Sequence, residues 1–199
     1  MAFTIRNYHP SDLPALYRIC LKTGDSGKDA TEIYSDPDLL GHIYAAPYAV
    51  FEPDLCFVAT KSDKPYGYIL GTKDSQKFYQ WCEKEWFPVL RNQYSLPDEE
   101  DNSAESNIIR KLHRKFEAEP GIEEYPAHLH IDILPEGQGF GLGWRLMKIF
   151  MDKLRELKVK GLHLGVGKKN LNAVKFYKHI GFKVFKEYEH HLILVINLD

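Results

Sequence analysis

Apolar and polar positions alternate along the chain with two different spacings, which predict short strands interleaved with amphipathic helices. Apolar side chains recur at every second residue in some segments and at every third or fourth residue in others, and these spacings are typical of strands and helices respectively. Strands are predicted at residues 3–8, 55–60, 66–71, 128–134, 162–166, 182–188 and 191–198. Helices are predicted at residues 11–22, 37–45, 75–94, 103–117, 141–157 and 170–180.

Turn-forming and helix-breaking residues refine this outline. Residues 61–65 read Lys-Ser-Asp-Lys-Pro between two strand-like runs, which indicates an antiparallel hairpin. Residues 23–29 are dense in turn formers and indicate a loop. Pro88 lies late in the helix predicted at 75–94 and should break or kink it, because proline has no amide proton to donate.

The strand, helix and strand between residues 128 and 166 predict a parallel strand pair, because the crossover helix returns the chain to the same side of the sheet. The other strands follow one another through shorter connections. We therefore expect an α/β (α+β) fold with a mixed, mostly antiparallel sheet, a central parallel strand pair and flanking helices. Nothing in residues 1–199 resembles a flexible linker, so a single domain is expected.

Composition and charge narrow the class of protein. Apolar residues make up 44% of the 199 residues, which is enough for a packed core, and the net charge of −2 offers no general attraction for nucleic acid or an acidic membrane. No apolar run approaches the length of a membrane-spanning helix. Cys20, Cys56 and Cys82 lie far apart without a C-x-x-C pair, so we expect core thiols in a reducing compartment and no metal bound by cysteines. A cytoplasmic protein is expected, with access to the nucleus left open.

A glycine-rich turn carries the first candidate chemistry. Residues 135–146 read Pro-Glu-Gly-Gln-Gly-Phe-Gly-Leu-Gly-Trp-Arg-Leu, between a predicted strand and a predicted helix. Glycine allows positive φ and close approach of a ligand to the backbone, and the first turn of the helix offers unpaired amides at the positive end of its dipole. An anion such as a pyrophosphate suits this place, and Arg145 would add charge. A turn that only packs a helix closely on a sheet explains the glycines equally well.

Two other phosphate-binding motifs fit the turn poorly. The spacing of Gly139, Gly141 and Gly143 does not match the G-x-G-x-x-G of dinucleotide-binding proteins. A P-loop requires lysine followed by serine or threonine, where this chain has Gly143 and Trp144. A dinucleotide-dependent oxidoreductase is therefore disfavoured.

The turn also matches a known family. The pattern Q-x-x-G-x-G at residues 138–143 resembles the Q/R-x-x-G-x-G/A signature of the GNAT superfamily of acetyltransferases, and it follows a strand as it does in that family. The pattern N-x-x-A-x-x-x-Y-x-x-x-G-F at residues 170–182 resembles the family's helix beside the cofactor. With the upstream strands, the resemblance covers nearly the whole chain and implies a GNAT fold that uses acetyl-CoA.

Three further segments suggest a subgroup of this family. Residues 20–25, 34–44 and 67–71 resemble the acetyltransferase-like domain at the C-terminus of animal O-GlcNAcases and related stand-alone microbial acetyltransferases. That subgroup has a helical insertion before the cofactor-binding strand, which corresponds to about residues 75–125. The animal domain is regarded as a pseudo-acetyltransferase with an incomplete cofactor site, whereas residues 138–143 are complete here. The resemblance therefore implies acetyl-CoA binding.

The resemblance also implies residue roles. Backbone amides of residues 131–134 would hold the pantetheine arm, and Tyr177 would donate a proton to the leaving thiolate, although a core aromatic beside Phe176 is the alternative. Asn170 would bind the pantetheine or only cap its helix. The full expected set for acetyl-CoA is Ile133, Leu134, Gln138, Gly139, Phe140, Gly141, Leu142, Gly143, Trp144, Arg145, Asn170, Ala173 and Tyr177.

The candidate base lies on the strand at 128–134. His128, His130 and Asp132 alternate toward one face, while Leu129, Ile131 and Ile133 take the other. An imidazole is suited to accepting a proton near neutral pH, so His130 is a candidate base. Asp132 would either orient His130 or serve as the base itself. A solvated sheet face is the alternative. Zinc is not expected from these three residues, because no fourth ligand is suggested by spacing.

Residues of the 23–51 region suggest the acceptor side. Asp25 and the aromatic residues Tyr34, Tyr44 and Tyr48 resemble the substrate-side loop of a GNAT domain, with ordinary packing as an equal alternative. The sequence thus predicts transfer of acetyl from acetyl-CoA to a primary amine on an unidentified acceptor. A catalytically inactive acetyltransferase-like binding module is the second hypothesis. The oligomeric state, including a homodimer, stays open.

Overall fold

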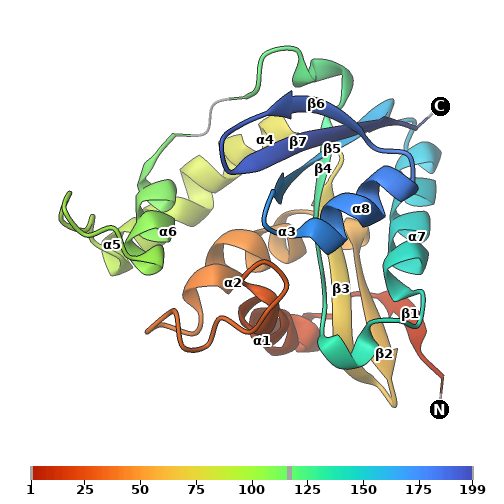
Figure 1. Cartoon of the computed structure of the whole chain (residues 1–199), viewed down its shortest axis with the longest axis horizontal. Helices are drawn as coiled ribbons and strands as arrows, with labels where there is room; N and C mark the ends of the chain where they lie inside the picture. Colours follow the sequence, from red (N-terminus) through yellow and green to blue (C-terminus); the bar gives the residue numbers. More distant parts are fainter. Residues whose placement is uncertain (1, 116–117, 199) are drawn as a thin grey trace.

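The computed structural model describes residues 2–115 and 118–198 and contains one seven-stranded sheet flanked by helices (Figure 1). The strands are β1 Thr4–Asn7, β2 Cys56–Lys61, β3 Lys64–Thr72, β4 Ala127–Ile133, β5 Gly161–Gly167, β6 Lys183–Glu187 and β7 His191–Asn197. The α-helices are α1 Leu13–Thr23, α2 Leu39–Tyr44, α3 Ala46–Phe51, α4 Ser75–Trp81, α5 Phe87–Gln93, α6 Ala104–His113, α7 Leu142–Glu156 and α8 Leu171–His179.

The sheet has the predicted mixed character. Its strand order is β1-β2-β3-β4-β5-β7-β6, and every neighbouring pair is antiparallel except β4 with β5. The hairpin between β2 and β3 turns through Ser62 and Asp63, both with positive φ, so it is tighter than the predicted five-residue connection. The predicted α/β fold with a central parallel pair is confirmed.

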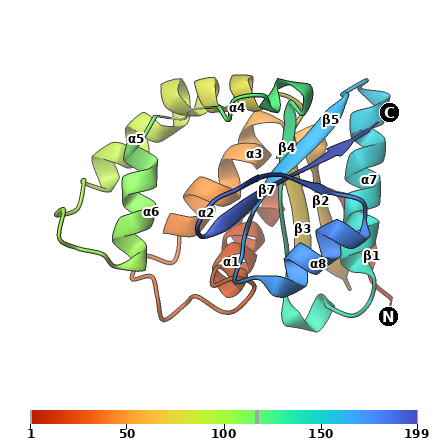
Figure 2. The same ribbon diagram turned by 45° about the horizontal axis from the view of Figure 1, so that its top comes forward.

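The central parallel pair separates soon after it begins. β4 and β5 pair only at Ala127 with Leu162 and at His128 with His163. On its other edge, β4 remains paired with β3 as far as Ile133. The two strands diverge beyond the paired residues (Figure 2). The edge of β4 that faces β5 is therefore left without a strand partner over its C-terminal half.

Two cores cover the two faces of the sheet. One is built around α7, with Leu146 and Phe150 fully buried against the sheet, and it includes Leu129 of β4. The other lies between the sheet and α1 to α6 and includes Tyr68 of β3. Since Tyr68 pairs with Asp132 in the register, His130 and Asp132 point toward the α1 side. The predicted alternation along this strand is confirmed.

The helical insertion differs in detail from the prediction. The helix predicted at 75–94 is divided into α4, a π-helical turn at Cys82–Trp86, and α5, which has Pro88 in its first turn. Proline is tolerated there because the first amides of a helix have no intrahelical acceptor. These segments and α6 extend to one side of the sheet (Figure 2).

Helix bounds differ at two other places. α6 begins at a Ser103 cap but ends at His113, where the predicted helix continued to 117, because Arg114 is already extended. Residues 116–117, the end of the predicted helix, lie outside the described residues. The helix predicted at 37–45 is α2, and α3 directly after it was not predicted. No helix in the described ranges is both long and apolar enough to cross a membrane.

Candidate active site

The glycine-rich turn connects β4 to α7 in a conformation that needs glycine at two positions. Gly139 and Gly141 have φ values of +79° and +71°, in the region that side chains disfavour. A Cβ built on either residue would meet no atom within 4 Å. Gly143 is different, because a Cβ there would lie 3.2 Å from the Phe176 ring. Two glycines therefore leave open space beside the backbone, and the third lets α7 and α8 approach each other.

The first turn of α7 presents unpaired amides to that space. The Arg145 amide donates to the Gly141 carbonyl at 3.1 Å, and no side chain caps the helix at Gly141. Among the described residues, the amides of Leu142, Gly143 and Trp144 have no hydrogen-bond partner. Such amides at the positive end of a helix dipole form an anion-binding site.

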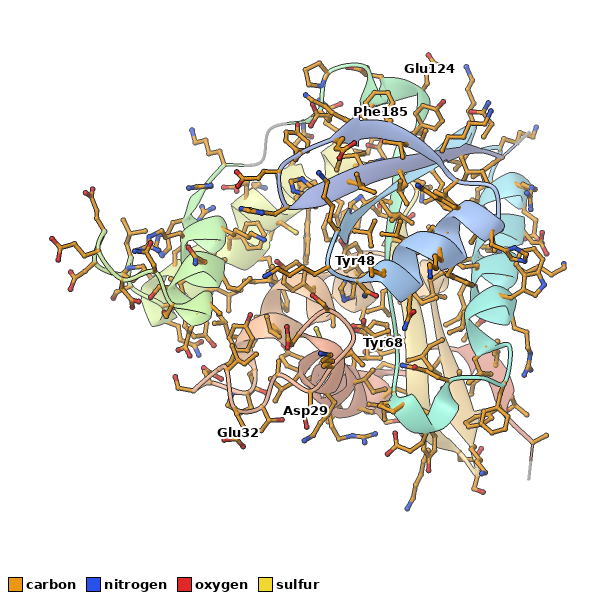
Figure 3. All side chains as sticks on the ribbon, in the orientation of Figure 1. Asp29, Glu32, Tyr48, Tyr68, Glu124 and Phe185 are labelled. Carbon is orange, nitrogen blue, oxygen red and sulfur yellow. The ribbon has the colours of Figure 1, made fainter. Side chains whose placement is uncertain are left out.

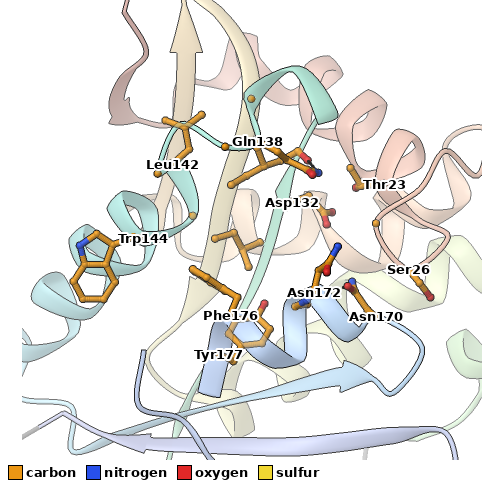
Figure 4. Close-up of a pocket in the computed structure, with 18 of the residues that line it drawn as sticks. Thr23, Ser26, Asp132, Gln138, Leu142, Trp144, Asn170, Asn172, Phe176 and Tyr177 are labelled. Atoms are coloured by element: carbon orange, nitrogen blue, oxygen red, sulfur yellow. Dashed lines mark hydrogen bonds between the residues drawn. The ribbon is translucent and has the colours of Figure 1, made fainter. Parts of the chain in front are cut away.

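A cavity of about 510 Å³ extends from this turn along the unpaired end of β4 (Figure 4). Its walls come from the end of β4, the glycine-rich turn, the start of α8 and the loop after α1. Ten of the residues predicted to bind acetyl-CoA line it: Ile133, Gln138, Gly139, Gly141, Leu142, Gly143, Trp144, Asn170, Ala173 and Tyr177. The structure therefore brings together two sequence motifs that are separated by a whole helix and strand.

Three residues of that predicted set lie outside the cavity. Leu134 is 5% exposed, and its amide donates to the Tyr66 carbonyl at 2.8 Å, so it faces β3. Phe140 packs on the Phe3 ring with centroids 5.1 Å apart. The Arg145 guanidinium donates two 3.2 Å hydrogen bonds to the Phe3 carbonyl. The charge of Arg145 is thus directed at the N-terminal strand and away from the anion-binding turn.

Gln138 and Asn170 line the cavity but also have local structural roles. The Gln138 side-chain amide donates to the Ile133 carbonyl at 3.0 Å and so fastens the turn to β4. The Asn170 side chain accepts from the Ala173 amide at 3.1 Å and caps α8. The capping role considered for Asn170 is therefore present, and its position at the cavity wall remains compatible with ligand binding.

Tyr177 lies on α8 and lines the cavity with a buried side chain. It is 7% exposed, and its ring contacts Phe176 and Phe182. Its hydroxyl points from α8 toward β4 (Figure 4). Burial, assisted by the Asp132 charge, raises the pKa of Tyr177 far above 10, so the phenol keeps its proton at neutral pH.

A second cavity of about 360 Å³ adjoins the first on the α1 side of β4. Asp132 and Tyr177 belong to the walls of both cavities, whereas His130 and the predicted Tyr34 line only the second. Residues between Thr23 and Gly27 form a further part of the shared wall. The two cavities therefore meet at the candidate acid, Tyr177, and at Asp132, the partner of the candidate base.

His130 and Asp132 form a hydrogen-bonded pair in the second cavity. His130 Nε2 lies 2.9 Å from Asp132 Oδ2, and the Tyr68 hydroxyl donates to the same oxygen at 2.5 Å. Tyr44 stacks on the imidazole with ring centroids 5.5 Å apart. Burial lowers the pKa of His130, but the Asp132 carboxylate outweighs this effect and holds the pKa well above 6.5.

Of the four predicted acceptor residues, Tyr34 and Tyr44 line the second cavity, whereas Asp25 and Tyr48 line neither cavity. Asp25 lies in the turn after α1, where its backbone pairs with Lys28. Tyr48 is 6% exposed, stacks on Phe78, and lies with its hydroxyl 2.7 Å from Nε2 of His128. Figure 3 shows Tyr48 inside the molecule. For Tyr48, ordinary packing is the arrangement observed.

Replacing Tyr48 by phenylalanine should therefore reduce stability. Ser75 donates to the Pro126 carbonyl and so accepts from Nδ1 of His128, which leaves Nε2 as the acceptor for Tyr48. Without the hydroxyl, this buried nitrogen loses its hydrogen bond with Tyr48, at a cost of about 1–3 kcal/mol. We expect the free energy of unfolding in urea to fall by that amount, with acetyl-CoA affinity unchanged. A change in affinity alone would contradict the packing role.

Sequence reasoning missed several residues of the second cavity. Cys20 of α1 and Lys111 of α6 both contribute to its wall. Tyr68 was noted only as part of a strand, although the register places it directly opposite Asp132. The pairing of β3 with β4 was the missing signal for Tyr68. For Cys20, no spacing in the sequence indicated that α1 packs beside β4.

Comparisons with known proteins agree with this geometry. A sequence model described as "Acetyltransferase (GNAT) family" matches residues 28–182. Protein O-GlcNAcase from Rattus norvegicus is 28% identical over 189 residues, which is 92% of this chain and 20% of that protein, and the Mus musculus protein matches equally. The chain thus spans about a fifth of the length of these curated relatives.

Solved structures show the same fold. The crystal structure of SsHAT has a TM-score of 0.92 and 33% identity, and the match covers 100% of both chains. The structure of yncA, a putative acetyltransferase from Salmonella typhimurium with its cofactor acetyl-CoA, has a TM-score of 0.59 and 15% identity over 100% of this chain and 95% of that one. At that lower identity the likeness concerns the fold alone.

Proposed function

Because the chain belongs to the acetyltransferase (GNAT) family, we propose that it transfers the acetyl group of acetyl-CoA to a primary amine on an acceptor that is still to be identified. One observation carries the proposal. The unpaired amides at the start of α7 and the unpaired edge of β4 line one cavity, and that cavity meets a second one at Tyr177 and Asp132.

The residues present fit acetyl-CoA. Its pyrophosphate suits the amides of Leu142, Gly143 and Trp144, beside which Gly139 and Gly141 leave open space. The unpaired edge of β4 offers backbone groups that can pair with the amides of the pantetheine arm in the manner of an added strand. When bound, acetyl-CoA supplies the acyl group in activated form, as a thioester.

Side chains at the junction of the two cavities would act as general base and general acid. Nε2–H of His130 donates to the Asp132 carboxylate. An amine bound in the second cavity would therefore lose a proton to Nδ1 of the neutral imidazole, directly or through water. Asp132, hydrogen-bonded to His130 and Tyr68, would orient the imidazole and attract the acceptor's cationic form. The buried Tyr177 hydroxyl keeps its proton at neutral pH and would donate it to the leaving sulfur.

The first test is calorimetric titration of the full chain with acetyl-CoA, followed by thiol release against a panel of amines and peptides. We expect one acetyl-CoA per chain and thiol release with at least one acceptor. Binding without thiol release from any amine would favour the inactive binding module. An absence of binding would overturn the proposed function and favour an inactive acetyltransferase-like module that does not bind the cofactor.

Replacing Tyr177 by phenylalanine tests the proposed acid. The ring and its contacts with Phe176 and Phe182 remain, but the proton donor is lost. We expect kcat to fall by about 100-fold or more, as is usual for loss of a general acid, with a dissociation constant for acetyl-CoA close to that of the parent chain. Steady-state thiol release and calorimetry measure the two quantities. An unchanged kcat would show that another group protonates the leaving sulfur.

A further inference from the structure

A thiol, an imidazole and a carboxylate converge at the inner wall of the second cavity. The ligand atoms of Cys20, His130 and Asp132 all lie within 4.8 Å of one another. Cys20 comes from α1 and the other two from β4, and all three line the cavity. We propose that these three residues form a binding site for Zn²⁺ with one coordination position open to the cavity.

The residue types and distances suit zinc. Zinc accepts thiolate, imidazole and carboxylate ligands at about 2.0–2.3 Å, so the ligand atoms of a tetrahedral site lie roughly 3.3–3.6 Å apart. His130 Nε2 and Asp132 Oδ2 are 2.9 Å apart and would separate slightly, while Cys20 Sγ would approach by no more than about 1.5 Å. Rotations of side chains are sufficient for such shifts. A thiolate in the set favours zinc over calcium or magnesium, which prefer oxygen ligands.

Neighbouring aromatic residues hold two of the ligands in place. The His130 ring stacks with both Tyr44 and Tyr68, with centroid distances of 5.5 and 6.0 Å and interplanar angles of 17° and 30°. The Tyr68 hydroxyl donates to Asp132. Hydrogen bonds of this kind to ligating carboxylates orient them and strengthen metal binding. Cys20 is 2% exposed and is fixed by the packing of α1.

The adjoining cavity provides access and the remaining ligand. Three protein ligands with an open fourth position are characteristic of zinc sites that exchange a water or a substrate group, in contrast to closed structural sites. The cavity of about 360 Å³ is large enough for such a ligand. If the proposed function holds, bound zinc would occupy both the candidate base His130 and its partner Asp132. Zinc would therefore inhibit acetyl transfer. Binding of the metal itself does not depend on that function.

Cobalt provides a direct test, because Co²⁺ replaces zinc and absorbs light. The full chain, kept reduced with a phosphine, is titrated with Co²⁺ in the absence of acetyl-CoA. We expect one equivalent to produce thiolate-to-cobalt charge-transfer absorption in the near ultraviolet with the d–d bands of four-coordinate cobalt, and one equivalent of Zn²⁺ to remove both. A spectrum without the thiolate band would overturn the site, whatever the outcome of the acetyl-CoA experiments.

Substitutions identify the thiol. Cys20→Ser should abolish the charge-transfer band and weaken Zn²⁺ binding by more than about tenfold. Even the loss of a residue that only hydrogen-bonds to a ligand often lowers metal affinity by this factor. Cys82→Ser is the matched control, because Cys82 is also a buried free thiol but lies outside the cluster, and it should keep the band. Equal Zn²⁺ affinity of Cys20→Ser and the parent chain would overturn the proposal. Should Cys20→Ser fail to fold, Asp132→Asn provides the test instead. This variant should keep the thiolate-to-cobalt band and bind Zn²⁺ more weakly than the parent chain.

Discussion

Replacing Gly141 by glutamate is expected to weaken acetyl-CoA binding by at least about 100-fold. Gly141 has a φ of +71° and precedes the unpaired amides of α7, and its missing Cβ leaves open space. A glutamate side chain would project into this space and place a negative charge where the pyrophosphate is proposed to bind. A 100-fold loss corresponds to about 2.7 kcal/mol of binding free energy. Calorimetric titration measures it directly.

Gly141→Ala separates charge from backbone strain. Both variants require a side-chain residue at positive φ, which costs about 1–2 kcal/mol of stability, so their free energies of unfolding should fall by similar amounts. Alanine adds only a methyl group to space that is open, and its acetyl-CoA affinity should stay within about tenfold of the parent chain. If Gly141→Glu folded and bound acetyl-CoA normally, the assignment of the first cavity would be wrong.

Replacing His130 by glutamine is expected to lower kcat/KM by about 10²–10⁴-fold, the usual contribution of a general base. Only the neutral imidazole accepts a proton, and Asp132 holds the pKa of His130 well above 6.5 despite the opposing effect of burial. The parent chain should therefore gain kcat/KM as pH rises through a value on the alkaline side of 6.5. Rates of thiol release measured across pH with a single acceptor should show this rise in kcat/KM, which forms the acidic limb of the pH profile.

Asp132→Asn should move the same limb to lower pH. Burial lowers the pKa of His130 and the Asp132 charge raises it, so removal of the charge leaves burial as the dominant effect. Because the acceptor is the same, its own ionisation contributes equally to both profiles. Acetyl-CoA affinity, measured in parallel, should change little. A limb that stays in place would show that His130 is not the group whose titration controls the reaction.

Features that depend on local chemistry were predictable from the sequence. The period-two pattern of β4 correctly placed His130 and Asp132 on one face. Gly139 and Gly141 were identified because positive φ and close approach select glycine, which is a requirement of the residues themselves. Pro88 marked the discontinuity between α4 and α5 for a similar reason.

Features that depend on contacts between distant segments were not predictable. Tyr48 and Arg145 have side chains suited to ligand binding, yet their partners are His128 and the Phe3 carbonyl, which the fold brings to them from other strands. Cys20 has no neighbour in sequence that suggests a site, and it reaches His130 only because α1 packs beside β4. Such contacts follow from the tertiary arrangement, and one sequence contains no direct signal for them.

The early separation of β4 from β5 also affects how the sheet holds together. Only two residue pairs join the half-sheet β1 to β4 with the half-sheet β5, β7 and β6. A molecule bound in the gap would contact both half-sheets, so its binding energy would add to the cooperativity of unfolding. At 100 times its dissociation constant, such a ligand adds about 2.7 kcal/mol of stability. A ligand bound there would supplement the core around α7, which already packs against both half-sheets, at the place where strand pairing is missing.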